Sequence, residues 1–324
     1  MTSRRQFLKN ASLLAVTGVC AVKSDVFAAS VSSYASKMNA NKIIGLQLYS
    51  LFVGGSTEFT QNVPDGLKRV AQMGYSTLEL ADYKDGGKIG EVPMAEFKKY
   101  ADDAGLKIIS SHLNPPVRVY TKENLESIKE FWKKAAGEHA AIGCKYMIQP
   151  GQPTTRSTED VAFVGEVFNE AGKIAKAEGL IYGYHNHSGE FASVVPGGTA
   201  PIIGGGEGFG RKRPEGIKII YDAMLEATDP SLVIFENDVY WTVMGQHDPV
   251  AYMKKYPNRI RVLHIKDAEV LGESGMMNFP KIFETAYANG ITEFIVELET
   301  YNGGTQFEGV KGCIDYLLNA SFVK

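Results

Sequence analysis

Cysteine is scarce in this sequence. Only three cysteines occur among 324 residues, and the first, Cys20, lies in an amino-terminal segment that we expect to be removed from the mature protein. Cys144 and Cys313 are far apart in the chain and lack the paired spacing of a zinc-binding motif. The composition therefore argues against a cysteine-based zinc site and a disulfide scaffold, and it indicates that both side chains are buried apolar residues.

The sequence also lacks a strong excess of charge. The formal net charge is −3, and residues 1–28 carry four lysines and arginines against one aspartate, so subtracting their +3 leaves −6 for the rest of the chain. An acidic mature chain argues against a nucleic-acid-binding face. Hydrophobic residues make up 44% of the chain and charged residues 22%, which is typical of a soluble globular protein.

No hydrophobic run is long enough for a comfortable membrane span. The apolar stretch Ala11–Val22 follows Ser3–Lys9, which is similar to the twin-arginine export consensus, and it precedes the small-residue cleavage site Val26–Ala28. We therefore expect residues 1–28 to be a twin-arginine signal peptide and residues 29–41 to be a spacer. This predicts a periplasmic or cell-envelope protein, whose mature form has no stable membrane span.

Residues 42–324 repeat one pattern, a short apolar run followed by an amphipathic segment. The expected strands are Ile43–Ser50, Ser76–Leu80, Lys107–Ser111, Tyr146–Gln149, Leu180–Tyr184, Leu232–Phe235, Ile260–His264 and Phe294–Glu299. The expected helices are Pro64–Met73, Met94–Ala104, Leu125–Ile142, Val161–Glu178, Pro249–Lys255, Phe279–Ala288 and Val310–Asn319.

Eight such units predict an α/β fold, a single-domain (β/α)8 TIM barrel, because parallel strands need crossover helices and eight strands close without an edge. The alternative is an open doubly wound sheet. It would need a glycine-rich first turn, which Leu48–Leu51 does not supply. The Gly/Pro-rich stretch Ser193–Glu215 includes the cluster Gly204–Gly210, and it is interpreted as a loop rather than a phosphate cradle.

Nearly every predicted strand ends in a side chain that can bind a metal or transfer a proton. At the carboxyl ends, where a barrel of this kind has its active face, the sequence places Gln47, Tyr49, Glu79, His112, Gln149, His185, His187, Glu190, Asp238, His264, Lys266, Glu297 and Glu299. Carboxylates and imidazoles without cysteine suit one divalent ion, Mn²⁺, Co²⁺, Zn²⁺ or Mg²⁺. Such an ion would polarise a carbonyl group and acidify the neighbouring C–H bond.

Several of these motifs resemble the sugar phosphate isomerase/epimerase superfamily, the xylose isomerase-like barrels. The resemblance covers Lys42–Leu318 and rests on Gly45–Ser50, Tyr184–Phe191, Asp238–Trp241, Arg259–Asp267 and Val296–Glu297. It implies a metal site made of a carboxylate from the fifth strand, an aspartate from the sixth, a histidine from the seventh and a glutamate from the eighth.

Carried to this chain, the resemblance implies Asp238, His264 and Glu297 as three ligands, with Glu299 as the alternative to Glu297. The fifth strand departs from many relatives, because His185 stands where they have glutamate. Glu190 is assigned as the fourth ligand, and a histidine of this segment stays open as the alternative.

The remaining polar side chains are expected to contact the substrate. His185, His187, Lys266 and Glu299 are the candidates for proton transfer and for stabilising charge on oxygen. The candidate substrate-binding residues are Gln47, Tyr49, Glu79, His112, Gln149 and Trp241. For each of them a purely structural role is the alternative.

The predicted function is a metal-dependent isomerase or epimerase that removes a proton next to the carbonyl of a sugar or keto-sugar. One alternative is a 3-keto-glycoside lyase, which would eliminate the C1 substituent after the same first step. A second alternative is a carbohydrate-binding barrel without catalysis. The expected partner is a small carbohydrate rather than a nucleic acid, and assembly with further copies of the chain is left open.

Overall fold

The barrel is formed by the unit Ile43–Lys324. The computed structural model of the protein describes residues 42–203 and 214–324. The predicted signal peptide and spacer therefore lie outside the described residues, and so does the glycine cluster Gly204–Gly210.

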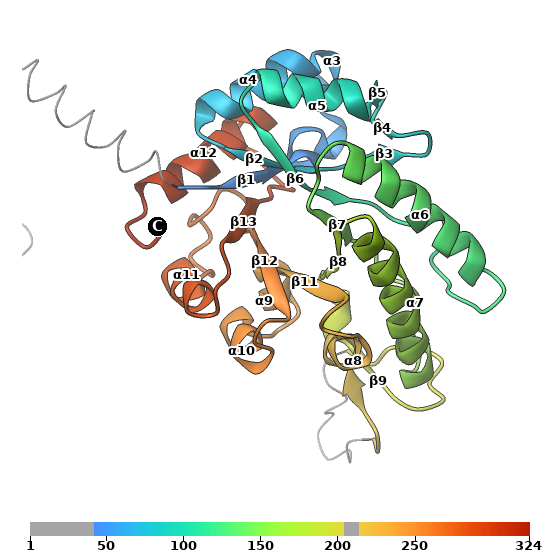
Figure 1. Ribbon diagram of the computed structural model, residues 1–324. Helices are drawn as coiled ribbons and strands as arrows, with labels where there is room; N and C mark the ends of the chain where they lie inside the picture. Colours follow the sequence, from blue (N-terminus) through green and yellow to red (C-terminus); the bar gives the residue numbers. More distant parts are fainter. Residues whose placement is uncertain (1–41, 204–213) are drawn as a thin grey trace, which may run out of the picture. The chain divides into compact units, whose positions relative to one another are not determined.

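Eight parallel strands close into a barrel, in the order β1-β13-β12-β11-β8-β7-β6-β2 (Figure 1). The barrel strands are β1 (Gly45–Gln47), β2 (Thr77–Leu80), β6 (Lys107–His112), β7 (Tyr146–Gln149), β8 (Ile181–His185), β11 (Val233–Asp238), β12 (Ile260–Ile265) and β13 (Glu293–Val296). This confirms the predicted TIM barrel, and each predicted strand overlaps one strand of the barrel.

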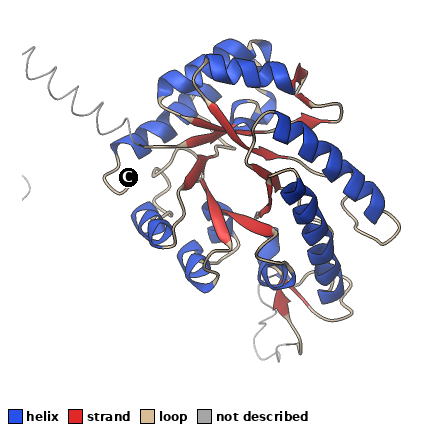
Figure 2. Ribbon diagram, viewed as in Figure 1, coloured by secondary structure: helices blue, strands red, loops and turns tan. Residues whose placement is uncertain are grey.

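Helices surround the barrel on its outer side (Figure 2). They are α3 (Glu58–Gln61), α4 (Val63–Met73), α5 (Met94–Asp103), α6 (Leu125–Ala141), α7 (Thr158–Ala177), α8 (Ile220–Ala227), α9 (Val239–Met244), α10 (Pro249–Lys255), α11 (Phe279–Ala288) and α12 (Gln306–Asn319). Three 3-10 turns accompany them, at Leu48–Leu51, Val53–Gly55 and Gly189–Phe191. No helix in the described part of the chain is long and apolar enough to cross a membrane.

Some elements differ from the prediction. The first strand ends at Gln47, because a 3-10 turn begins at Leu48 and Gln47 Oε1 accepts a hydrogen bond from the Tyr49 amide at 2.9 Å. The last strand ends at Val296, so Glu297 and Glu299 lie in the loop that follows. Three helices, α3, α8 and α9, were not predicted, nor were two small sheets. One sheet consists of β3 (Tyr83–Lys84), β4 (Lys88–Ile89) and β5 (Val92–Pro93), and the other of β9 (Ser193–Val194) and β10 (Lys218–Ile219).

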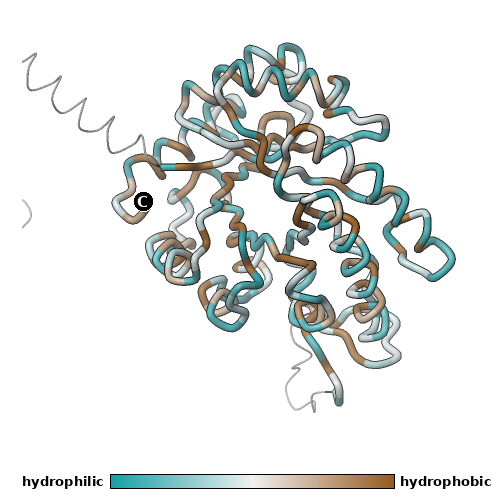
Figure 3. The backbone as a smooth tube through the Cα atoms, viewed as in Figure 1, coloured by the Kyte–Doolittle hydropathy of each residue, from teal (hydrophilic) through white to brown (hydrophobic). Residues whose placement is uncertain are grey.

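Apolar side chains fill one part of the barrel interior and leave the polar strand ends together. One buried cluster consists of the strand residues Tyr146, Ile148, Ile234, Val262 and Ile295, and a much larger one packs the helices against the barrel. In Figure 3 brown hydrophobic segments run along the strands and the inner sides of the helices.

A glycine lets this inner cluster pack. A Cβ on Gly183 in β8 would approach Ile148 Cδ1 to 2.5 Å and Ile234 Cγ1 to 2.9 Å, closer than side chains tolerate.

The predicted burial of Cys144 and Cys313 is confirmed, and neither cysteine forms a disulfide.

Candidate active site

Four buried side chains at neighbouring strand ends form a constellation that could hold a metal ion, which we call the upper group. It consists of His185 from β8, Asp238 from β11, His264 from β12 and Glu297 directly after β13, with one potential ligand atom of each within 4.8 Å of the others. His264 Nδ1 lies 3.5 Å from Glu297 Oε2, and His185 Nε2 lies 4.0 Å from Asp238 Oδ2. Ligand atoms about 2.1 Å from a divalent ion are separated by roughly 3.0–3.4 Å when adjacent and by about 4.2 Å when opposite in an octahedron. The two distances in the upper group are long for hydrogen bonds and are compatible with an ion between the ligand atoms.

Two atoms of the upper group lack any hydrogen bond. Asp238 Oδ2 and His264 Nδ1 are buried and unpartnered among the described residues. The other oxygen, Asp238 Oδ1, accepts the Trp241 amide at 2.8 Å and so caps α9. Burial raises the pKa of Asp238 to about 7. An unpartnered buried carboxylate oxygen beside an unpartnered imidazole nitrogen is unfavourable by itself, and a divalent cation would satisfy both atoms.

A second set of buried side chains, the lower group, lies against the same histidines. It consists of His112 from β6, Glu236 from β11 and Glu79 from β2, together with the other ring nitrogens of His185 and His264. Here the contacts are short. His264 Nε2 is 2.6 Å from Glu79 Oε1, and His112 Nε2 is 2.8 Å from Glu236 Oε2.

The lower group is hydrogen bonded, because 2.6 and 2.8 Å are ordinary hydrogen-bond lengths. His112, His185, Glu236 and His264 also offer ligand atoms within 4.8 Å of one another, so these four side chains are a second set that could hold an ion. Burial and the neighbouring carboxylate of Glu79 raise the pKa of Glu236 to about 7. Burial alone would raise the pKa of Glu79 as well, but the contacts with His112 and His264 outweigh this effect and lower the pKa of Glu79 to about 2.

Glu190, the ligand assigned from the sequence, lies outside both groups. Its Oε1 accepts the Tyr184 hydroxyl at 2.5 Å, and its Oε2 accepts the His187 amide at 3.0 Å. Both carboxylate oxygens are thus engaged in holding the turn after β8. The geometry corrects the expectation from the sequence, since His185 and not Glu190 brings a ligand atom to Asp238, His264 and Glu297.

Lys266 is a buried cation beside the upper group. Its ammonium lies 3.2 Å from Glu297 Oε2, 2.8 Å from Glu299 Oε1 and 5.4 Å from the centre of the Trp241 ring. Its side chain is only 2% exposed, and the carboxylates outweigh burial and raise the pKa of Lys266. Glu299 is 26% exposed on its side chain, so its carboxylate is the more accessible of the two.

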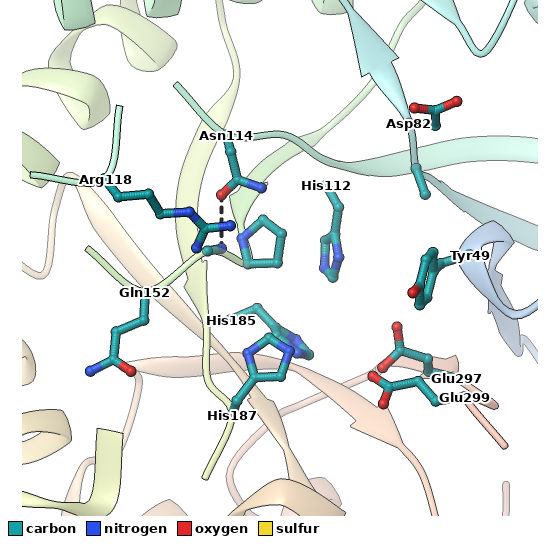
Figure 4. Close-up of a pocket in the computed structure, with 13 residues that line it drawn as sticks. Tyr49, Asp82, His112, Asn114, Arg118, Gln152, His185, His187, Glu297 and Glu299 are labelled. Atoms are coloured by element: carbon teal, nitrogen blue, oxygen red, sulfur yellow. Dashed lines mark hydrogen bonds between the residues drawn. The ribbon is translucent and has the colours of Figure 1, made fainter. Parts of the chain in front are cut away.

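A cavity of about 670 Å³ opens over the upper group. Figure 4 shows His112, His185 and His187 in its centre, Tyr49, Glu297 and Glu299 on one side, and Asn114, Arg118 and Gln152 on the other. Among the predicted residues, Tyr49, His112, His185, His187, Glu297 and Glu299 line the cavity.

Three predicted substrate contacts are buried away from the cavity lining. Gln47 donates to Glu79 Oε1 at 2.7 Å, and Gln149 accepts the hydroxyl groups of Tyr120 and Tyr182 at 3.1 and 3.0 Å. These contacts fit the structural alternative for Gln47, Glu79 and Gln149. Trp241 packs beside His187, with ring centres 5.8 Å apart.

Glu236 was missed in the sequence analysis. It precedes Asp238 by two residues, so strand alternation places both carboxylates on the same face of β11. That spacing was the available signal, and the sequence prediction ended the sixth strand at Phe235. Asn114, Arg118 and Gln152 were missed because they lie in loops after β6 and β7, where no periodic pattern fixes the direction of a side chain.

The sequence profile of the xylose isomerase-like TIM barrel family matches residues 67–318. The chain belongs to this family. A crystal structure of a sugar phosphate isomerase/epimerase from Parabacteroides distasonis ATCC 8503 is 50% identical, with a TM-score of 0.79 and coverage of 88% of this chain and 100% of the other. The structure of D-psicose 3-epimerase from Clostridium cellulolyticum H10 with D-tagatose is 16% identical to this chain, with a TM-score of 0.59. The match covers 83% of this chain and 89% of the epimerase, and at that identity it shows a shared fold alone.

Two curated relatives are inosose dehydratases. The one from Geobacillus kaustophilus (strain HTA426) is 24% identical over 217 residues, which cover 62% of this chain and 60% of the relative. The one from Clostridium tetani (strain Massachusetts / E88) is 31% identical over 99 residues, 31% of this chain and 26% of the relative. The chain thus spans less than two thirds of the length of these relatives.

Proposed function

We propose that the protein is a divalent-metal-dependent enzyme that removes a proton next to the carbonyl group of a sugar or keto-sugar, with epimerisation or isomerisation as the outcome. The observation that carries the proposal is the pair of buried, unpartnered atoms in the described site, Asp238 Oδ2 and His264 Nδ1, which face ligand atoms of His185 and Glu297. Membership in the isomerase-like family supports the same class of reaction.

The four side chains of the upper group fit the ion. Two carboxylates and two imidazoles suit Mn²⁺, Co²⁺, Zn²⁺ or Mg²⁺, and His185 takes the place that the sequence analysis gave to Glu190. When bound, the ion would polarise the substrate carbonyl and make the adjacent carbon more acidic.

His187 and Glu299 are the proposed proton carriers. Burial lowers the pKa of His187 to about 4, so its imidazole is neutral near pH 7 and has a lone pair for a substrate proton, but it is a weak base. Glu299 Oε1 is held by the Lys266 ammonium at 2.8 Å, and both Glu299 and His187 line the cavity from different sides (Figure 4). Epimerisation needs a proton to leave one face of the carbon and to return on the other, which two separate carriers would provide.

A lyase reaction is the second candidate. The cavity of about 670 Å³ extends past the histidines to Asn114, Arg118 and Gln152, which gives room for a second group beside the reacting sugar. The dehydratase relatives favour an elimination, although their identity to this chain is low. In a 3-keto-glycoside, removal of the C2 proton would be followed by departure of the C1 substituent.

Deuterium exchange tests both candidates. Metal-loaded protein is incubated in D₂O with a panel of ketoses and 3-keto-glycosides, and the products are examined by NMR and mass spectrometry. We expect metal-dependent incorporation of deuterium next to the carbonyl, and release of the aglycone would select the lyase. Exchange that continues after EDTA treatment, or that survives in Asp238→Asn, would contradict the proposed site.

We also propose that the protein is exported by the twin-arginine route. The support is the Ser3–Lys9 consensus with the apolar stretch and cleavage site behind it. Replacing Arg4 and Arg5 together by lysine should retain the protein in the cytoplasm. Export at the original level in that variant, measured by fractionation, would refute the proposal.

A further inference from the structure

Two glutamates below the upper group contact its histidines but not the cavity. Glu79 and Glu236 are both fully buried, and neither lines the cavity. In the upper group, His185 and His264 offer only one ring nitrogen each. Their other ring nitrogens point to these two carboxylates.

Glu79 holds His264. Its Oε1 accepts from His264 Nε2 at 2.6 Å and from Gln47 Nε2 at 2.7 Å, and its Oε2 accepts the Ser110 hydroxyl at 2.5 Å. Three donors fix this carboxylate in place. Because a carboxylate only accepts, the proton of a neutral His264 ring stays on Nε2, and Nδ1 keeps its lone pair toward Asp238 and Glu297.

Glu236 holds His185 through the other ring nitrogen, Nδ1. Its Oε2 accepts from His185 Nδ1 at 3.1 Å, which leaves Nε2 of the same ring with a lone pair toward Asp238 Oδ2 at 4.0 Å. His112 Nε2 lies between the two carboxylates, 2.8 Å from Glu236 Oε2 and 3.0 Å from Glu79 Oε1. His264 Nε2 also lies near both, 3.3 Å from Glu236 Oε2 in addition to its contact with Glu79. These ring nitrogens reduce the repulsion between the two glutamates.

The backbone supports this arrangement at both glutamates. The register of β2 against β6 shifts between Leu78 and Glu79, and that of β11 against β12 shifts between Phe235 and Glu236. Such irregularities turn a side chain relative to the regular strand. The two shifts occur at the residues that reach the histidines.

We propose that Glu79 and Glu236 are positioning residues of the metal site, which fix the tautomers of His264 and His185 and make their free nitrogens better ligands. The inference rests on the proposed metal site and adds a requirement to it: the two ligand histidines have opposite tautomers, Nε2–H in His264 and Nδ1–H in His185. Hydrogen-bonded carboxylates of this kind usually strengthen metal binding by a histidine about 10- to 100-fold.

The tautomers are measured on the unmodified protein loaded with Zn²⁺, by ¹⁵N NMR of the histidine rings. We expect zinc-bound Nδ1 with protonated Nε2 in His264, and zinc-bound Nε2 with protonated Nδ1 in His185. The same tautomer in both rings would overturn the inference. This measurement needs no variant, so a failure of Glu79→Gln to fold does not weaken the test.

The affinity for Mn²⁺ is then measured by calorimetry for Glu236→Gln and Glu79→Gln. Each should bind about 10- to 100-fold more weakly than the unmodified protein. The matched control is Glu190→Gln, a buried carboxylate that contacts Tyr184 and His187 but neither ligand histidine, and it should bind within twofold. Unchanged affinity in both test variants would overturn the positioning role, whereas absence of Mn²⁺ binding in the unmodified protein would overturn the proposed metal site itself.

Discussion

The two oxygens of Asp238 have different surroundings, and the difference predicts the effect of removing the charge. Oδ1 caps α9 through the Trp241 amide, and an asparagine can keep that bond, whereas Oδ2 is the buried atom without a partner. Asp238→Asn should therefore fold and should bind Mn²⁺ at least about 100-fold more weakly. Calorimetry checks this, with Asp267→Asn as the control.

The control is a buried aspartate that belongs to neither group. Asp267 is 2% exposed and accepts the amides of Ala268 and Gly272 at 2.8 and 2.9 Å and the hydroxyl of Ser274. Its variant should keep the original affinity for Mn²⁺. If Asp238→Asn binds as tightly as Asp267→Asn, then Asp238 is not a ligand.

Protons should compete with the metal. Burial raises the pKa of Asp238 to about 7, and although burial alone would lower the pKa of His264, Glu236 and Glu79 raise it well above its usual value. Both groups must lose a proton to act as ligands, so affinity for Mn²⁺ should fall about tenfold per pH unit below pH 7 for each proton released. Calorimetry at pH 6 and pH 8, in buffers of different ionisation enthalpy, should show tighter binding at pH 8 with release of protons. Equal affinity and no proton release would contradict this expectation.

At the scale of single residues, the sequence shows which side chains could bind a metal better than it shows which side chains they contact. Strand-end position selected thirteen polar residues, and only the resemblance to the xylose isomerase-like barrels singled out Asp238, His264 and Glu297 among them as ligands. Glu190 and His185 could not be ranked from the sequence, since the choice depends on the turn after β8, where the Tyr184 hydroxyl and the His187 amide engage the Glu190 carboxylate. Such contacts depend on three-dimensional geometry that periodicity does not contain.

Among the elements, those with an amphipathic pattern and clear caps were predicted best. Helices α10 and α11 have the predicted bounds, and proline near the start of each marks the first turn. Helix α8 was missed because it has only eight residues and begins without a capping side chain, although Asp222 and Glu226 lie four residues apart on one face. The register shifts in β2 and β11 likewise leave no mark in the sequence.

Helix α6 carries a buried histidine that should make stability depend on pH. His139 is fully buried, its Nδ1 donates to the Ala135 carbonyl at 2.7 Å, and burial lowers its pKa to about 4. The unfolded chain binds a proton at this residue near pH 6.5 while the folded protein does not, so stability is lost as the pH falls from 6.5 toward 4.

The loss from this one residue should reach about 2 kcal/mol at pH 5. Urea unfolding of the unmodified protein and of His139→Leu at pH 7 and pH 5 isolates it. The leucine variant should lose less stability than the unmodified protein between these two pH values. Parallel losses in both proteins would show that His139 does not contribute.

In the whole molecule, barrel closure converts eight separate strand ends into one site. Residues as distant in sequence as Glu79 and His264 come within 2.6 Å because β2 and β12 face the same interior. The fold class therefore predicts that polar strand ends meet at one face of the barrel, and the family resemblance was needed to choose the ligands among them.

The same closure makes metal binding a property of the folded barrel, so the ion should stabilise the whole chain. The upper group joins β8, β11, β12 and the segment after β13, and an unfolded chain does not bring these ligands together. At a free Mn²⁺ concentration 100 times the dissociation constant, stability should rise by about 2.7 kcal/mol, or roughly 5 °C in Tm. Differential scanning calorimetry should show this shift in the unmodified protein and in Asp267→Asn, and EDTA should reverse it. Asp238→Asn should show a rise of about 0.4 kcal/mol or less at the same Mn²⁺ concentration. An equal shift in that variant would mean that Mn²⁺ stabilises the protein at some other place.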